Sequence, residues 1–183
     1  PLMHACDSDR GDIVQFLLDQ GADVPSINSN RNTPLHIACE TGCAYVVRLL
    51  LDYGAIIDAK GKLKSTPLHV ACGKYSSVEV VNLLLDRGAE LESRGKDGAT
   101  ALHRACQVGQ LDTTEILLDR GADIEARGKN EKTPLHYLCE NVNSPSYEYL
   151  KVAELILDRS GNLEAKTIER LTPLHIACRN GNF

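Results

Sequence analysis

Histidine and cysteine residues occur three positions apart at several places in the chain, and side chains of these types could bind a metal ion. Imidazole nitrogen and thiolate sulfur are both zinc ligands, and residues three apart lie on the same face of a helix. A zinc site needs about four ligands at one point, so it can form only if the fold brings two pairs together. The pairs are His36 with Cys39, His69 with Cys72 and His136 with Cys139.

These pairs are part of a motif that repeats along the chain. The segment Thr33-Pro34-Leu35-His36 has counterparts that begin at Thr66, Thr100, Thr133 and Thr172, at intervals of 33, 34, 33 and 39 residues. One period upstream, Pro1-Leu2-Met3 is the remnant of an earlier copy. The predicted repeats are residues 1–32 (partial), 33–65, 66–99, 100–132, 133–171 with a six-residue insertion, and 172–183 (partial).

The repeated motif resembles that of ankyrin repeats, which have a period of about 33 residues and a Thr-Pro-Leu-His-x-Ala signature. The resemblance covers essentially the whole chain. It implies an all-α ankyrin-repeat solenoid, in which helix-turn-helix units stack and β-hairpin loops join them. We expect one such domain over residues 1–183.

The residues of a single repeat favour the same structure independently. Thr33 is a good N-cap, and Pro34 suits the first helical position because its missing N–H needs no partner there. This first helix is expected to end near Gly42, and a second helix with one apolar face follows. Gly54 suits a left-handed residue after the second helix, and residues 55–65 suit a hairpin-like connection.

The composition also agrees with stacked helical layers. Of the 183 residues 43% are hydrophobic, but only 4% are aromatic and none is Trp. Layers of Leu, Val and Ala need few large rings, whereas a single spherical core usually contains more of them. No apolar run approaches the roughly 18 residues of a membrane span. The net charge of −5 disfavours a dedicated nucleic-acid binder.

The repeat pattern predicts that the histidines and cysteines are structural. Stacked helices are about 8–10 Å apart, which separates successive pairs too far for a metal site and exceeds the ~7 Å limit between disulfide Cα atoms. In the ankyrin family the signature histidine packs and forms hydrogen bonds. We therefore expect no metal, no cofactor and no catalytic site. Small buried residues are expected at Cys6, Cys39, Cys72, Cys106, Cys139 and Cys178.

The seventh cysteine, Cys43, lies outside the series and is expected to be a free thiol at a helix–helix turn. An odd, unpaired set of cysteines indicates a reducing compartment. We therefore expect a cytoplasmic protein, with the nucleus as a second possible compartment.

Two repeats depart from the regular period between their helices. The third has one extra residue, where Ser76 and Glu79 have the spacing of a capping box. The fifth has six extra residues within Asn141–Tyr149. Two interpretations remain open: Ser144-Pro145 begins a longer second helix, or the insertion is a loop that contacts a partner. Ser160-Gly161 replaces the usual Gly-Ala, which predicts an irregular turn.

Hairpin tips and the ends of the first helices line the concave groove in the ankyrin family. From the second tip onward, seven of the eight residues at the position before the tip and at its second position are basic. The second helices are rich in Asp and Glu, so we expect a basic groove and an acidic back. Alternatively, acids at the hairpin bases, such as Glu90 and Glu125, neutralise the tips. The candidate partner-binding residues, which include apolar anchors, are Lys60, Lys62, Leu63, Lys74, Tyr75, Arg94, Lys96, Gln107, Val108, Arg127, Lys129, Lys132, Lys166, Ile168 and Leu171.

These features favour a non-catalytic protein-interaction module. We expect a monomer without a small-molecule substrate, whose groove binds an acidic, partly apolar segment of a partner protein. Both ends of the sequence fall inside a repeat, so an alternative is a regulatory or targeting region of a larger multidomain enzyme or channel. Nucleic-acid binding through the basic tips is a weaker alternative.

Overall fold

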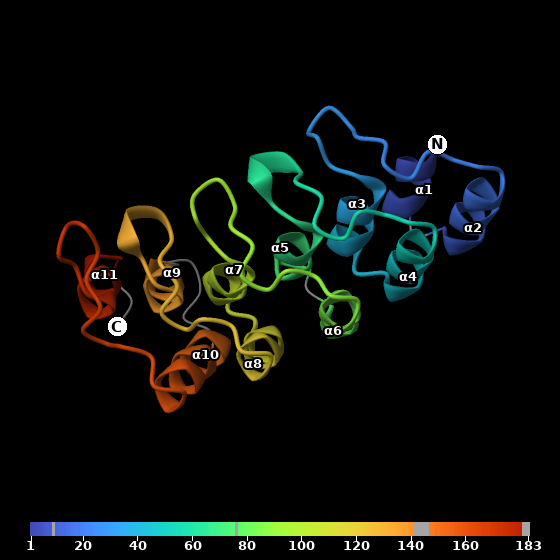
Figure 1. The fold of residues 1–183 in the computed structure, drawn as a ribbon. Coiled ribbons are helices and arrows are strands. Elements are labelled where there is room, and N and C mark those ends of the chain that lie inside the picture. Colours follow the sequence, from blue (N-terminus) through green and yellow to red (C-terminus); the bar gives the residue numbers. More distant parts are fainter. Residues whose placement is uncertain (9, 76, 141–146, 181–183) are drawn as a thin grey trace. The chain divides into compact units, whose positions relative to one another are not determined.

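The regular structure of this chain is helical (Figure 1). A computed structural model describes residues 1–8, 10–75, 77–140 and 147–180, and these residues contain no strand. The predicted all-α fold is confirmed. By their internal contacts the residues form two compact units, Pro1–Ser93 and Arg94–Phe183. The assignment of residues 1–183 to one domain stays a prediction.

Two layers of helices build the N-terminal unit (Figure 1). The first helices of successive repeats pack against one another, and the second helices form the other layer. Leu35, Val47 and Leu50 are fully buried between the layers. The first layer contains α1 (Leu2–Asp7), α3 (Pro34–Thr41) and α5 (Pro67–Ala71), the second contains α2 (Gly11–Asp19), α4 (Ala44–Asp52) and α6 (Val78–Asp86), and the short helix η1 (Lys62–Lys64) belongs to a hairpin loop.

The C-terminal unit has the same arrangement. Its first helices pack in the order α7, α9, α11, and α8 packs against α10. Leu117 and Ile156 are fully buried, and Leu102 is nearly so. The helices are α7 (Ala101–Val108), α8 (Leu111–Asp119), α9 (Pro134–Glu140), α10 (Tyr147–Asp158) and α11 (Pro173–Asn180), with the short helix η2 (Lys129–Glu131) in a loop.

The signature histidine connects the start of a helix to the end of the following loop. The Thr33 backbone N–H donates to His36 Nδ1 at 3.2 Å, and His36 Nε2 lies 3.0 Å from the Ser65 carbonyl oxygen. Because Nδ1 accepts a backbone N–H, the neutral ring carries its proton on Nε2 and donates it to that carbonyl. The predicted structural role of these histidines is confirmed. The same pair of contacts occurs at His103 with Thr100 and Lys132, and at His136 with Thr133 and Leu171.

Burial decides the chemistry of most aligned cysteines. Cys39 is fully buried, and this burial raises the pKa of its thiol far above the ordinary value. Burial likewise raises the pKa of Cys6 to about 11 and that of Cys106 to about 12. All seven cysteines are free thiols, and Cys43 lies in the turn between α3 and α4 as expected.

The prediction of burial is wrong at Cys178, which is exposed, while Cys139 is only half-buried. Cys178 belongs to α11, and among the described residues no later helix packs on the outer side of α11.

Each hairpin loop ends in a five-residue turn, which we call a tip. In the second tip the Gly61 N–H donates to the Ser65 carbonyl oxygen at 2.9 Å, and the Lys64 N–H donates to the Gly61 carbonyl oxygen at 3.1 Å. The loops are hairpin turns, but the described residues form no β-ladder around them, so the expected β-hairpins are reduced to closed turns. The fourth residue of each tip is left-handed, with φ between 57° and 70°. The tips are residues 28–32, 61–65, 95–99, 128–132 and 167–171.

The structure changes the interpretation of both departures from the period. Ser77 caps α6 by accepting the Val80 N–H at 3.4 Å. The predicted capping box is therefore wrong by one residue, and Ser76 itself lies outside the described residues. α10 has 12 residues, compared with nine in α8, so the second helix is longer by three residues, and the loop that contacts a partner stays a prediction. Ser144-Pro145 lies outside the described residues.

The turn after α10 is regular, contrary to the expectation from its sequence. Ser160 has φ of 70°, at the left-handed position that Gly54 and Gly121 occupy in other repeats. The Gly161 N–H donates to the Ile156 carbonyl oxygen at 2.8 Å, as in the other turns. These hydrogen bonds hold a serine in a conformation that glycine reaches without steric cost.

We expect the substitution Ser160→Gly to raise the free energy of unfolding by roughly 0.5–1 kcal/mol, because it relieves this left-handed strain. Urea denaturation followed by circular dichroism measures the change. Ser29→Gly is the control, since Ser29 is an exposed tip residue outside the left-handed set. A Ser160→Gly protein no more stable than the wild type would contradict the prediction.

The stability of the fold should decrease in acid. Burial lowers the pKa of His36 and of His136 below the ordinary value of 6.5. The unfolded chain therefore binds protons that the folded chain does not, so stability is full above 6.5 and is lost as pH falls through the lowered pKa values. Urea midpoints at about pH 7.5 and about pH 5.5 test this expectation. The double variant His36→Gln/His136→Gln should show a smaller pH dependence, and an unchanged dependence would rule out these two rings as its source.

Candidate functional site

Arginine side chains connect neighbouring tips in the C-terminal unit. Arg94 Nη1 donates to the carbonyl oxygen of Gly98 in its own tip at 3.1 Å and to that of Arg127 at 2.6 Å. Arg127 repeats the pattern, with Nη1 at 2.9 Å from the Glu131 carbonyl oxygen and 3.1 Å from that of Lys166. Two predicted partner-binding cations therefore hold the loops at a set spacing.

Two further predicted cations have partners inside their own units. Lys60 Nζ donates to Ser93 Oγ at 3.1 Å. Lys132 forms an ion pair with Glu140, the last residue of α9. This pair is partly buried, so the Lys132 charge is largely compensated before any partner arrives.

The remaining candidate lysines in the tips, or directly before a tip, are exposed. The structure joins their ammonium groups to no other described residue by a hydrogen bond or ion pair. Three of them occupy the second position of a tip, directly after Gly61, Gly95 and Gly128. The four lysines are Lys62, Lys96, Lys129 and Lys166.

Three apolar candidates have exposed side chains. Leu63 is 51% exposed, Ile168 is 63% exposed and Tyr75 is 68% exposed. Lys74 Nζ lies 5.7 Å from the centre of the Tyr75 ring, which gives that exposed surface both charge and apolar area. Leu63 also has left-handed φ of 56°, a costly conformation for a large side chain.

Three candidates contribute mainly to the scaffold. Val108 and Leu171 are half-buried, and the Leu171 carbonyl oxygen accepts the proton of His136 Nε2. Gln107 Oε1 accepts a hydrogen bond from Arg104 Nη1 at 2.9 Å. Their assignment as contacts for a partner stays a prediction.

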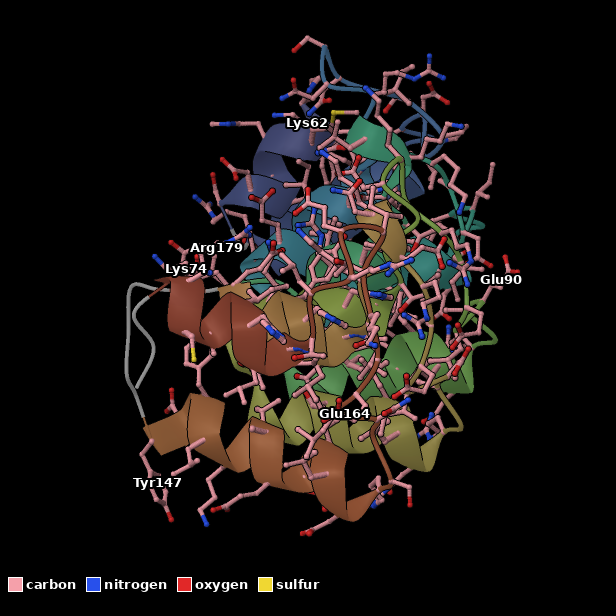
Figure 2. The ribbon with its side chains drawn as sticks, turned by 90° about the vertical axis from the view of Figure 1, so that its left-hand side faces the viewer. Lys62, Lys74, Glu90, Tyr147, Glu164 and Arg179 are labelled. Atoms are coloured by element: carbon pink, nitrogen blue, oxygen red, sulfur yellow. The ribbon has the colours of Figure 1, made fainter. Side chains whose placement is uncertain are left out.

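Three of the acidic residues at the hairpin bases accept hydrogen bonds from other residues of the hairpin bases. Asp58 accepts the Glu90 N–H at 3.1 Å, and Glu90 accepts the Ser93 hydroxyl at 2.9 Å. Glu125 accepts the Asn162 N–H at 2.8 Å. Figure 2 shows Glu90 and Lys74 on opposite sides of the N-terminal unit.

Carboxylates of the second helices connect successive repeats. The layer that the second helices form is called the outer layer below. Asp52 pairs with Arg87 at 2.9 Å in the N-terminal unit, and Asp119 pairs with Arg159 at 2.8 Å in the C-terminal unit. In each case an acid at the end of one second helix meets an arginine just after the next. The acidic layer is thus partly neutralised by its own arginines.

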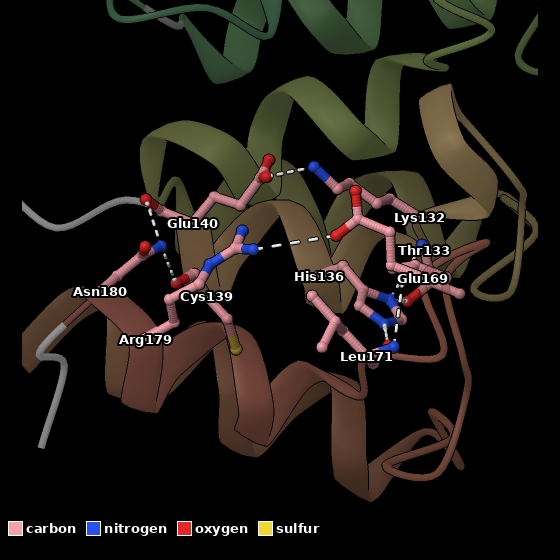
Figure 3. Close-up of polar contacts among 10 residues, drawn as sticks. Lys132, Thr133, His136, Cys139, Glu140, Glu169, Leu171, Arg179 and Asn180 are labelled. Carbon is pink, nitrogen blue, oxygen red and sulfur yellow. Dashed lines mark hydrogen bonds and ion pairs between the residues drawn. The ribbon is translucent and has the colours of Figure 1, made fainter.

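Polar contacts at the ends of α9 and α11 were not anticipated from the sequence (Figure 3). Asn180 Nδ2 donates to the carbonyl oxygens of Cys139 at 3.4 Å and Glu140 at 3.2 Å, at the C-terminal end of α9. Arg179 lies 3.9 Å from Glu169. The partners of Asn180 lie about one repeat away, so a local sequence pattern does not indicate them.

Exposed aromatic side chains on the outer layer were also missed. Phe16, Tyr45 and Tyr147 are all exposed, so several of the few rings in this chain lie on its surface. These three aromatic residues lie outside the repeated family signature, and this is the feature of the sequence that could have indicated their exposure. In Figure 2 Tyr147 lies at the beginning of α10.

Over the described ranges, no three His, Cys, Asp or Glu side chains come together as a metal site would require. The helices of the described residues are all too short or too polar to cross a membrane.

Comparison with known families identifies the repeat. The family model described as Ankyrin repeats (3 copies) matches residues 2–94 and 68–163. A search of curated proteins finds no match. The family match covers most of the chain, and the paired helices and signature histidines have the expected structure, so the chain belongs to the ankyrin-repeat family.

Proposed function

We propose that this chain is a non-catalytic interaction module whose tips bind an acidic, partly apolar segment of a partner protein. Ankyrin repeats are generally protein-interaction modules. The chain acts as a monomer in this proposal. Its free thiols fit a reducing compartment, the cytoplasm or the nucleus.

The observation that carries the proposal is the division of the tip cations into two groups. Lys60, Arg94 and Arg127 each donate a hydrogen bond to the next hairpin loop, whereas Lys62, Lys96 and Lys129 keep exposed ammonium groups at one repeated position. A solvated lysine costs little in the free chain and gains Coulomb energy when a carboxylate approaches. Asp97 and Glu131, in the same tips, oppose part of this charge.

Apolar residues near the lysines supply the second part of an interface. Leu63 and Ile168 lie in tips, and Tyr75 lies in the turn between α5 and α6. Exposed side chains of this size release the most free energy when a partner removes them from water. The charged residues would then set the rate and orientation of binding, and the apolar residues would supply affinity.

Nucleic-acid binding and intramolecular regulation are the two alternative functions for these tips. Single-stranded nucleic acid needs aromatic platforms along a basic groove. None of the described tips contains an aromatic residue, and the net charge is −5. A regulatory region would use the same tips to bind an acidic segment of its own longer chain, which a binding assay with that segment would detect.

Charge reversal at the tips should weaken partner binding. Partners captured with the wild-type chain are first identified by mass spectrometry, and their affinity is then measured by calorimetry at several salt concentrations. The triple variant Lys62→Glu/Lys96→Glu/Lys129→Glu should bind about tenfold or more weakly, with a smaller salt dependence, because it loses three attractive charges.

The single variants Lys62→Glu and Arg48→Glu provide a matched control. Both lie in the N-terminal unit and change the net charge equally, but Arg48 is an exposed residue of the outer layer. Only Lys62→Glu should reduce affinity. If the triple variant binds as tightly as the wild type, the proposal is wrong.

The substitution Leu63→Gly should change stability and binding in opposite directions. Removing a side chain from φ of 56° should raise the free energy of unfolding by about 0.5–1 kcal/mol. Losing the exposed side chain should also weaken partner binding several-fold. Urea denaturation and calorimetry measure the two effects, with Asn130→Gly, also left-handed at φ of 57°, as the comparison for stability. If Leu63→Gly binds the partner as tightly as the wild type, Leu63 is not part of the interface.

A further inference from the structure

Three successive tips of the C-terminal unit present a row of side chains at one repeated position. Lys96, Lys129 and Ile168 are each the second residue of a tip, and all three are exposed. The row therefore consists of two cations followed by one apolar residue. Each member follows a backbone N–H that closes its tip, at Gly95, Gly128 and Thr167.

Hydrogen bonds between the tips keep this row at a regular spacing. Arg94 bonds to the Arg127 carbonyl oxygen, and Arg127 bonds to the Lys166 carbonyl oxygen. The last two tips are also joined by their backbones, because the Ile168 N–H donates to the Asn130 carbonyl oxygen at 3.1 Å. Neighbouring repeats are separated by about 8–10 Å, the usual distance between packed helices. The row can therefore measure distances along a bound segment.

We infer that the C-terminal unit selects an extended segment with acidic residues three positions apart and an apolar residue three positions further on. This inference rests on the proposed function and adds a spacing rule to it. In the extended polyproline II conformation a chain advances about 3.1 Å per residue with three residues per turn, so every third side chain lies on the same face and three residues span about 9 Å, which matches one repeat. The order acid, acid, apolar matches Lys96, Lys129 and Ile168 in turn.

A helical segment fits the same row less well. A helix rises about 1.5 Å per residue, so one repeat corresponds to six or seven residues and the full row to about 13. An isolated helix of that length is only marginally stable in water, so part of the binding free energy would be spent on folding the peptide. The extended segment places all three groups within seven residues.

Labelled peptides of equal composition test the spacing on the full chain by fluorescence anisotropy. One pair has the acids and the leucine at every third position, written in both chain directions, because the structure leaves the direction of the segment open. A second pair has them at every second position, and a third pair at every seventh position with helix-forming residues between them. At least one every-third peptide should bind about fivefold more tightly than all the others.

Charge-swap experiments then assign the register. Lys129→Glu should weaken the best peptide about fivefold, and replacing the middle acid of that peptide by lysine should restore binding to this variant but not to Lys96→Glu. Ile168→Ser should weaken only peptides that carry the leucine. Lys151→Glu, which lies on α10 away from the tips, is the matched control.

The possible outcomes separate this inference from the proposed function. Equal binding of all spacings, with loss in Lys96→Glu and Lys129→Glu, would overturn the spacing rule but leave the acidic partner in place. Preference for every second or every seventh position would also overturn it. If no acidic peptide binds, and the captured partner binds the lysine variants as tightly as the wild type, both proposals are wrong.

Discussion

The whole structure depends on the neutral imidazole of the signature histidine, because one ring joins the start of its own helix to the end of the following tip. Its Nδ1 accepts the N–H of the residue that caps its own helix, and its Nε2–H reaches a carbonyl at the end of the following tip. The approach is close: a Cβ added at Gly61 would lie 2.7 Å from His36 Nε2. A protonated ring could not accept at Nδ1, so the same contact makes the fold sensitive to acid.

That contact also explains why the tips can carry function. Three of the tips are attached to the buried layers at their closing carbonyls, those of Ser65, Lys132 and Leu171, so their outer residues need not contribute to folding. Natural chains place binding residues on loops that a rigid scaffold supports. In the C-terminal unit the arginines before the tips add rigidity, and the lysines after the tip glycines remain available for a partner.

The few aromatic residues show how little the core depends on large rings. Layers of Leu, Val, Ala and buried Cys fill the space between the helices, and most of the described rings are exposed, with Tyr137 buried against His103 as an exception. Buried hydroxyls are accommodated where local acceptors exist: Thr114 Oγ1, at a position that is Val in the second and third repeats, donates to the Gln110 carbonyl oxygen at 2.7 Å. The Thr114 hydroxyl thus remains compatible with stacking because it finds an acceptor at the start of its own helix.

The sequence by itself determined the helices, the turns and the structural role of the histidines, because these depend on short-range rules. Thr33-Pro34 starts a helix, Gly42 ends it, and the 33-residue period aligns the copies. Only the tertiary structure decided which basic residues are available to a partner. Arg94 and Lys96 are both simply basic residues in the sequence. In the structure, however, Arg94 bonds to the carbonyl oxygen of Arg127, 33 residues away and directly before the next tip, and Lys132 pairs with a carboxylate on the next helix. Whether a charge is compensated depends on distances between repeats, and a repeat pattern does not contain those distances.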